Sequence, residues 1–226
     1  MLAEEEKLKK IKVKSAEMSS HVVEMFGGAV RAVTSHDLSL GGEVRDRDDM
    51  VDELEVELEA MCLTFLALYA PKAWELRYVA AVLRLICDLE RVGDHSAIIA
   101  SSVFRHSYLP LLESLPDFGK MADKAGRMLA SAAESFFARD PGKYGELCGE
   151  DVEIGRFQSG LNKSLVGLIT KEPAGAIDAV SLINDIRRIE RVADHAKNIA
   201  ALAPYVVNGT VARHGGARVK EADPGD

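Results

Sequence analysis

Two short segments of the chain place carboxylates where a helix is expected to present apolar side chains. The first segment, 88–100, follows a run of aliphatic residues at helical spacing that ends at Ile86. Continuing that face by four and eight residues gives Glu90 and Asp94, which lie one turn apart on one side of a helix. A carboxylate is costly to bury alone, so such groups are usually paired, protonated or bound to a metal ion. Two carboxylates at this spacing suit a cation that prefers oxygen ligands.

The same segment returns at 188–200, and the two copies are offset by 100 residues throughout. Isoleucines at helical spacing again lead to a Glu and an Asp one turn apart. Four residue types keep their places in both copies: Glu90, Arg91, Asp94 and His95, and Glu190, Arg191, Asp194 and His195. An echo at a fixed period indicates an internal repeat, so we expect two copies of one structural unit.

A second acidic group precedes the first copy. Asp48 and Asp52 lie beside the apolar stripe of a helix expected at 39–69. If that helix neighbours the one that carries Glu90 and Asp94, the four carboxylates complete a cation site.

The corresponding site of the second copy should be poorer in ligands. Asp151 stands where the first copy has Asp48, but Gly155 stands where it has Asp52. Asp151, Glu190 and Asp194 are therefore its candidate metal ligands.

Apolar periodicity predicts an all-α fold without strands. Pro71 and Pro173 interrupt the pattern at equivalent places, and Pro110 and Pro116 bracket a linker between the halves. Short connections make antiparallel neighbours, so each half is predicted to be a three-helix bundle. We expect the first repeat at 1–109, the second at 110–205, and a polar, Gly-rich tail, disordered at its end, at 206–226. The expected helices are 4–36, 39–69, 73–107, 118–139, 143–170 and 174–203.

Composition narrows the class of protein. The net charge of −8 argues against binding nucleic acid, which requires basic patches. Cys62, Cys87 and Cys148 are widely spaced, odd in number and form no CxxC, which indicates reduced thiols in a reducing compartment. The sequence has no signal peptide and no apolar run of membrane-spanning length. These features predict a cytoplasmic protein that binds cations or basic partner surfaces.

Together the motifs resemble the PhoU family, the regulators of bacterial phosphate uptake, over nearly the whole chain. The pieces are Asp48-x-x-x-Asp52, Pro71-x-x-x-x-Leu76-Arg77, the signatures at 89–95 and 189–195, and the ending at 205–214. The resemblance implies two PhoU repeats, metal bound through E(D)xxxD motifs, and a homodimer. It also implies that the protein shuts down phosphate-starvation signalling by contacting a phosphate ABC transporter and its sensor histidine kinase. Such a protein meets the membrane only through its partners. Gly155, and Ala193 in place of Gly93, depart from the first copy.

The expected mechanism is that of an adaptor and not of an enzyme. Hard oxygen ligands favour iron as the metal, with manganese, magnesium or calcium as alternatives, and the small number of histidines weakens the case for zinc. Whether the metal is structural or bridges to phosphate stays open. The candidate ligands are Asp48, Asp52, Glu90, Asp94, Asp151, Glu190 and Asp194.

Three other interpretations remain. A carboxylate-bridged di-metal enzyme in a helical bundle normally carries Glu-x-x-His on two helices, which this sequence lacks. A phosphatase would need an open metal position, which sequence neither shows nor excludes. In a purely structural interpretation, Glu90 pairs with Arg91 or Arg84, and Asp94 pairs with a basic residue of a neighbouring helix.

Overall fold

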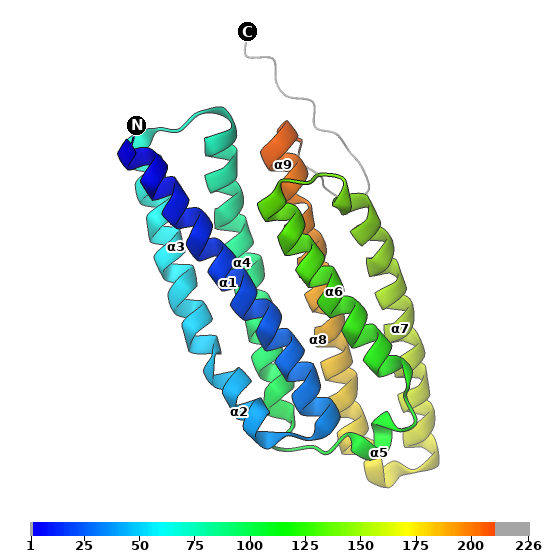
Figure 1. Ribbon diagram of the computed structural model, residues 1–226. Helices are drawn as coiled ribbons and strands as arrows, with labels where there is room; N and C mark the ends of the chain where they lie inside the picture. Colours follow the sequence, from blue (N-terminus) through cyan, green and yellow to red (C-terminus); the bar gives the residue numbers. More distant parts are fainter. Residues whose placement is uncertain (1, 211–226) are drawn as a thin grey trace.

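The computed structural model describes residues 2–210, which form helices and no strands. Two three-helix bundles lie side by side with their long axes nearly aligned (Figure 1). The first contains α1 (Leu2–Ser35), α3 (Asp48–Tyr69) and α4 (Ala73–Ser102), and the second contains α6 (Asp117–Ala138), α7 (Lys143–Lys171) and α8 (Ala176–Ala200). Short elements complete the chain: α2 (Leu38–Asp46), α5 (Leu109–Leu112), η1 (Pro173–Gly175) and α9 (Leu202–Asn208). The predicted all-α fold of two bundles is confirmed.

The second helix is interrupted, whereas the sequence pattern predicted one helix over 39–69. Arg47 forms a turn that separates α2 from α3. Gly41 and Val44 are buried in α2, and Val51 is buried in α3. The interruption makes Asp48 the first residue of α3, at a helix N-terminus, where the helix dipole favours negative charge.

Helix α4 ends earlier than predicted, and the linker that follows it contacts the second bundle. Helix α4 ends at Ser102 and not near 107, and the following residues dock on α8. The Tyr108 hydroxyl donates to Asp185 Oδ2 at 2.9 Å and lies 2.7 Å from Ser181 Oγ. His106 Nδ1 lies 2.7 Å from Asp178 Oδ1. Because Tyr108 and Asp185 are both buried, these contacts fix the linker against the second bundle.

The chain remains helical past the predicted end at 203. Helix α9 continues to Asn208 and returns toward the start of α4, where Arg77 Nε donates to the Val206 carbonyl at 3.1 Å. Residues 211–226 of the expected polar tail lie outside the described residues. None of the described helices is both long enough and apolar enough to cross a membrane.

Helices α4 and α8 form the largest contact between the two bundles, and α1 packs on α6 beside it (Figure 1). They carry the two repeated segments, so the signatures from the two halves lie close in space. The imidazole centroids of His95 and His195 are 5.9 Å apart at this contact. The core runs continuously through both bundles, which makes the two repeats one packed unit.

The close approach of α2 to α4 gives a test of this packing. A Cβ added to Gly41 would lie 2.6 Å from Val103 Cγ1 and 3.0 Å from the Ala100 carbonyl oxygen. Gly41→Ala is therefore expected to lower the free energy of unfolding by about 1–3 kcal/mol, the usual cost of overpacking. Urea unfolding followed by circular dichroism measures it.

Gly42→Ala is the matched control, because its Cβ would meet only Phe104 Cζ, at an ordinary 3.8 Å. It should be neutral or stabilising by up to about 1 kcal/mol, since Ala favours helix over Gly. Equal effects of the two substitutions would contradict the packing of α2 on α4.

Candidate functional site

The first-repeat cluster consists of Asp48, Glu90 and Asp94. Asp48 opens α3, and the other two lie one turn apart on α4, which packs along α3. Gly93 permits the close approach, because a Cβ at this position would lie 3.3 Å from Asp48 Oδ1 and 3.3 Å from Val51 Cγ1. Asp94 acts on the pKa of both Asp48 and Glu90, so it lies near each of these carboxylates.

The cluster holds negative charge that its surroundings do not fully satisfy. Asp48 Oδ1 is buried and has no hydrogen-bond partner among the described residues. Burial, followed by the nearby Asp94 and Asp52 carboxylates, raises the pKa of Asp48 to about 6. Burial and Asp94 likewise raise the pKa of Glu90 to about 7, against the opposing effect of Arg91. The electrostatic cost would fall if a cation entered the cluster.

Arg91 provides partial compensation. The structural interpretation expected it as a partner of Glu90, but the partner of Asp94 is also Arg91, on the same helix, and not a basic residue of a neighbouring helix. Arg91 Nε lies 3.3 Å from Glu90 Oε2, and Arg91 Nη1 lies 3.4 Å from Asp94 Oδ2. The Arg91 side chain is 62% exposed, so solvent weakens both pairs. It approaches the cluster from outside and leaves Asp48 Oδ1 unsatisfied.

The fourth predicted ligand, Asp52, lies one turn further along α3 and is exposed. It is near enough to raise the pKa of Asp48. Within residues 2–210, no three His, Cys, Asp or Glu side chains already stand in positions to hold a metal ion together. A bound ion would require the flexible carboxylates to turn toward it. The orphaned oxygen of Asp48 fits such a rearrangement, and Gly93 lets this oxygen lie close to α4.

The second-repeat cluster consists of Asp151 on α7 and Glu190 and Asp194 on α8. Sequence reasoning missed the residue that completes it, Lys197. The Lys197 ammonium donates to Asp151 Oδ2 at 2.5 Å and to Asp194 Oδ1 at 3.0 Å. Burial opposes its charge, but these two carboxylates outweigh burial and raise the pKa of Lys197. A positive charge already occupies the place between the helices, so this cluster does not fit a metal ion.

The two signature histidines lie apart from the metal candidates, in the contact between α4 and α8. His195 Nδ1 lies 2.9 Å from Asp88 Oδ1, which also accepts from Asn198. His95 Nδ1 is buried without a partner among the described residues. Burial, His195 and Arg188 lower the pKa of His95 to about 4, so this imidazole is neutral near pH 7. We assign both histidines to the packing between the repeats.

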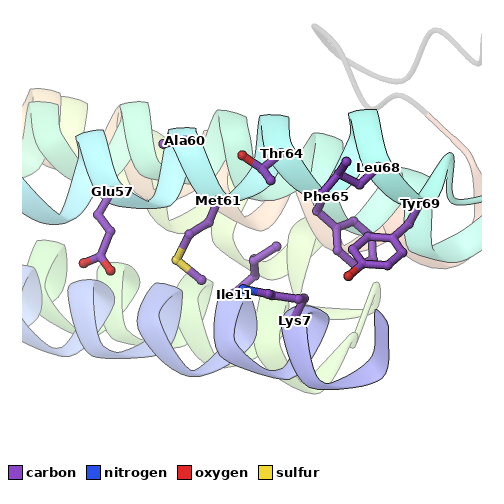
Figure 2. Close-up of a pocket in the computed structure, with 9 residues that line it drawn as sticks. All are labelled: Lys7, Ile11, Glu57, Ala60, Met61, Thr64, Phe65, Leu68 and Tyr69. Carbon is purple, nitrogen blue, oxygen red and sulfur yellow. The ribbon is translucent and has the colours of Figure 1, made fainter. Parts of the chain in front are cut away.

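A groove of about 310 Å³ lies elsewhere, between α1 and α3. Figure 2 shows Met61, Phe65 and Tyr69 of α3 pointing toward Ile11 and Lys7 of α1. Its wall is mostly apolar, with charged groups only at Lys7 and Glu57. Nothing in the sequence pattern distinguishes these residues from an ordinary helix contact.

Comparison with known proteins adds a functional context. The model of the PhoU domain matches the chain twice, at residues 16–103 and 118–203. A Deinococcus radiodurans protein named phosphate-specific transport system accessory protein PhoU homolog is 30% identical over 85% of this chain and 91% of its own length. A Pseudomonas aeruginosa protein of the same name is 29% identical over 91% and 88%.

Solved structures agree with this result. The crystal structure of PhoU from Pseudomonas aeruginosa has a TM-score of 0.83 and 25% identity, covering 91% of this chain and 99% of the other. The structure of the phosphate transport system regulatory protein PhoU from Streptococcus pneumoniae has a TM-score of 0.82 at 24% identity, covering 93% and 100%, and supports the fold.

The raised pKa of Glu90 predicts how stability changes with pH in metal-free protein. Its stabilising contribution is complete below the unfolded-state pKa, near 4.5, and is lost as pH rises through about 7. Glu90→Gln cannot ionise, so it should match the wild type near pH 4.5 and exceed it at pH 8. We expect about 1 kcal/mol, less than the full shift implies, because water reaches the cluster. Urea unfolding in chelator at the two pH values measures the difference.

Glu53→Gln, at an exposed position of α3, serves as the control and should show no such pH dependence. If the free energy of unfolding of Glu90→Gln differed from that of the wild type by the same amount at both pH values, the pKa of Glu90 would not be raised by its surroundings.

Proposed function

This chain belongs to the PhoU family, and we propose that it regulates phosphate uptake as an accessory protein of a phosphate transport system. The observation that carries the proposal is the match of both repeats to the PhoU domain. Relatives named as phosphate-specific transport system accessory proteins cover most of the chain and support it.

The finer proposal is an adaptor that acts from the cytoplasm. It would contact a phosphate ABC transporter and a sensor histidine kinase, and it would silence starvation signalling when phosphate is plentiful. The resemblance of the two signatures to the family motifs motivates this partner pair. The proposed mechanism needs binding surfaces on a rigid helical body and no turnover of substrate. We also propose that the protein acts as a homodimer.

We further propose that the first-repeat cluster, with Asp52, binds one metal ion. Asp48 Oδ1, which is buried and has no partner among the described residues, supports this, as does its close approach to α4 at Gly93. A cation with hard oxygen ligands would neutralise the carboxylates and tie the start of α3 to α4. Iron is our first candidate and manganese our second; magnesium, calcium and zinc are less favoured.

The metal proposal predicts opposite effects of Asp94→Asn with and without metal. In chelator, the variant should be more stable than the wild type, because one repelling carboxylate is gone. With Fe²⁺ or Mn²⁺ at a hundredfold excess over its dissociation constant, the wild type should gain about 3 kcal/mol and the variant much less. Thermal melts under both conditions measure the crossover.

Asp123→Asn on α6 is the control at an exposed site away from both clusters and should leave the response to metal unchanged. If added metal did not change the melting temperature of the wild type, the proposed metal site would be wrong. If Asp94→Asn lowered stability equally with and without metal, Asp94 would act only as the ion-pair partner of Arg91.

The regulatory role predicts a cellular phenotype. Deleting the gene in its native host should leave phosphate-starvation genes switched on in high phosphate, because the silencing contact is lost. A reporter of those genes measures the effect, and tagged protein from cells in high phosphate should co-purify with transporter or kinase subunits. Normal repression in the deletion strain would argue against the proposed role. Robust turnover of a substrate, abolished by Glu90→Gln, would favour an enzyme.

A further inference from the structure

Among the positions at which the two copies of the repeated segment differ, one bears most directly on the acidic clusters: residue 97 in the first copy and residue 197 in the second. Ala97 is a buried methyl group on α4, whereas Lys197 extends from α8 toward carboxylates on two helices. Its Nζ atom lies 2.5 Å from Asp151 Oδ2 and 3.0 Å from Asp194 Oδ1. A single ammonium group thus joins α7 to α8 at the place where the first-repeat cluster has no lysine.

We propose that Lys197 replaces the metal ion in the second repeat, so that this chain binds metal at the first-repeat cluster alone. The proposal rests on the metal site of the proposed function and assigns it to one repeat.

The position of the ammonium accounts for both parts of the proposal. A cation between two helices neutralises their carboxylates and links them, and Lys197 does both through charge-assisted hydrogen bonds. A hard metal ion would need these same Asp151 and Asp194 oxygens at about 2.0–2.6 Å. The ion and the protonated amine cannot share that space, and their like charges repel.

Two further residue differences make the second repeat a weaker metal site than the first. Gly155 takes the place of Asp52, and a Cβ built on it would meet nothing within 4 Å among the described residues. Ala193 takes the place of Gly93, the residue that lets Asp48 approach α4 closely in the first repeat. Both differences weaken the second site, so an ion admitted by the removal of Lys197 should bind there less tightly than in the first repeat.

The asymmetry has a functional consequence. The Lys197 bridge between α7 and α8 is part of the chain and does not depend on the metal supply. The corresponding link between the carboxylates of α3 and α4 would form only when the metal is bound. The response of the protein to metal is therefore confined to the first repeat.

The test counts bound metal in the full chain. Wild type and variants are stripped with chelator, dialysed against Mn²⁺ and analysed for manganese and protein. We expect one ion per chain for the wild type, two for Lys197→Ala and one again for Lys197→Ala with Asp194→Asn. Asp94→Asn alone should bind none. Lys197→Gln keeps the side-chain length without the charge, and replaces Lys197→Ala if that variant does not fold.

A melting experiment gives a second readout. In chelator, Lys197→Ala should melt below the wild type, because Asp151 and Asp194 lose their shared partner. Saturating Mn²⁺ should raise its melting temperature more than that of the wild type, and the added rise should vanish with Asp194→Asn.

The outcomes separate this inference from the proposed function. A wild type that binds two ions, one of them lost with Asp194→Asn, overturns the role of Lys197 and leaves the first site intact. Lys197→Ala that still binds one ion, with no added thermal response, also overturns it. A wild type that binds none while Lys197→Ala binds one removes the first site and supports the replacement. No binding by any form overturns both.

Discussion

Carboxylates on the face where two helices meet require a positive charge, and each repeat of this protein meets that requirement in a different way. In the second repeat the positive charge belongs to a side chain of the protein. The Lys197 ammonium donates hydrogen bonds to Asp151 on α7 and to Asp194 on its own helix. In the first repeat, among the described residues, Glu90 and Asp94 pair with Arg91, whose side chain is largely in solvent. Burial and a neighbouring aspartate raise the pKa of Glu90 and of Glu190 alike, so the clusters differ in their aspartates. Asp151 and Asp194 share the Lys197 ammonium, whereas Asp48 Oδ1 has no partner among the described residues.

The first cluster depends on packing that is set some distance away. Helix α2 docks against the end of α4 through Gly41, and the turn at Arg47 then starts α3 in a new direction. This places Asp48 at a helix N-terminus and against Gly93, where a side chain would crowd its carboxylate. The backbone N–H groups at that end favour negative charge, which offsets part of the cost of burial. The site is therefore a product of the α2–α3 interruption as much as of its acidic residues.

The fold and the acidic helices could be predicted because their signals are local. Glu90 and Asp94 break an apolar stripe of helical period, and the offset of 100 residues exposes the repeat. The interruption at Arg47 carries no Pro or Gly of its own and follows from the docking of α2, which is a tertiary effect. Lys197 had a signal, since aligning the two copies sets it against Ala97, but its partner Asp151 lies on another helix, 46 residues away. The metal itself stays a prediction, because carboxylate spacing alone does not distinguish an ion from a basic side chain.

The contact between the repeats shows the same divergence in charge. Position 88 is Asp and position 188 is Arg, although both belong to the repeated segment. Asp88 bonds to His195, whereas burial, His195 and, to a smaller extent, Arg188 lower the pKa of the equivalent His95 to about 4 and keep it neutral near pH 7. Two like-charged imidazoles 5.9 Å apart would repel, and the neutral state of His95 removes that repulsion. Helices α4 and α8 can then pack tightly along the seam that holds the bundles together. In both places the second copy has exchanged one side chain for a basic one, Arg188 and Lys197, and the result is a molecule whose halves share a fold but differ in the charge that completes them.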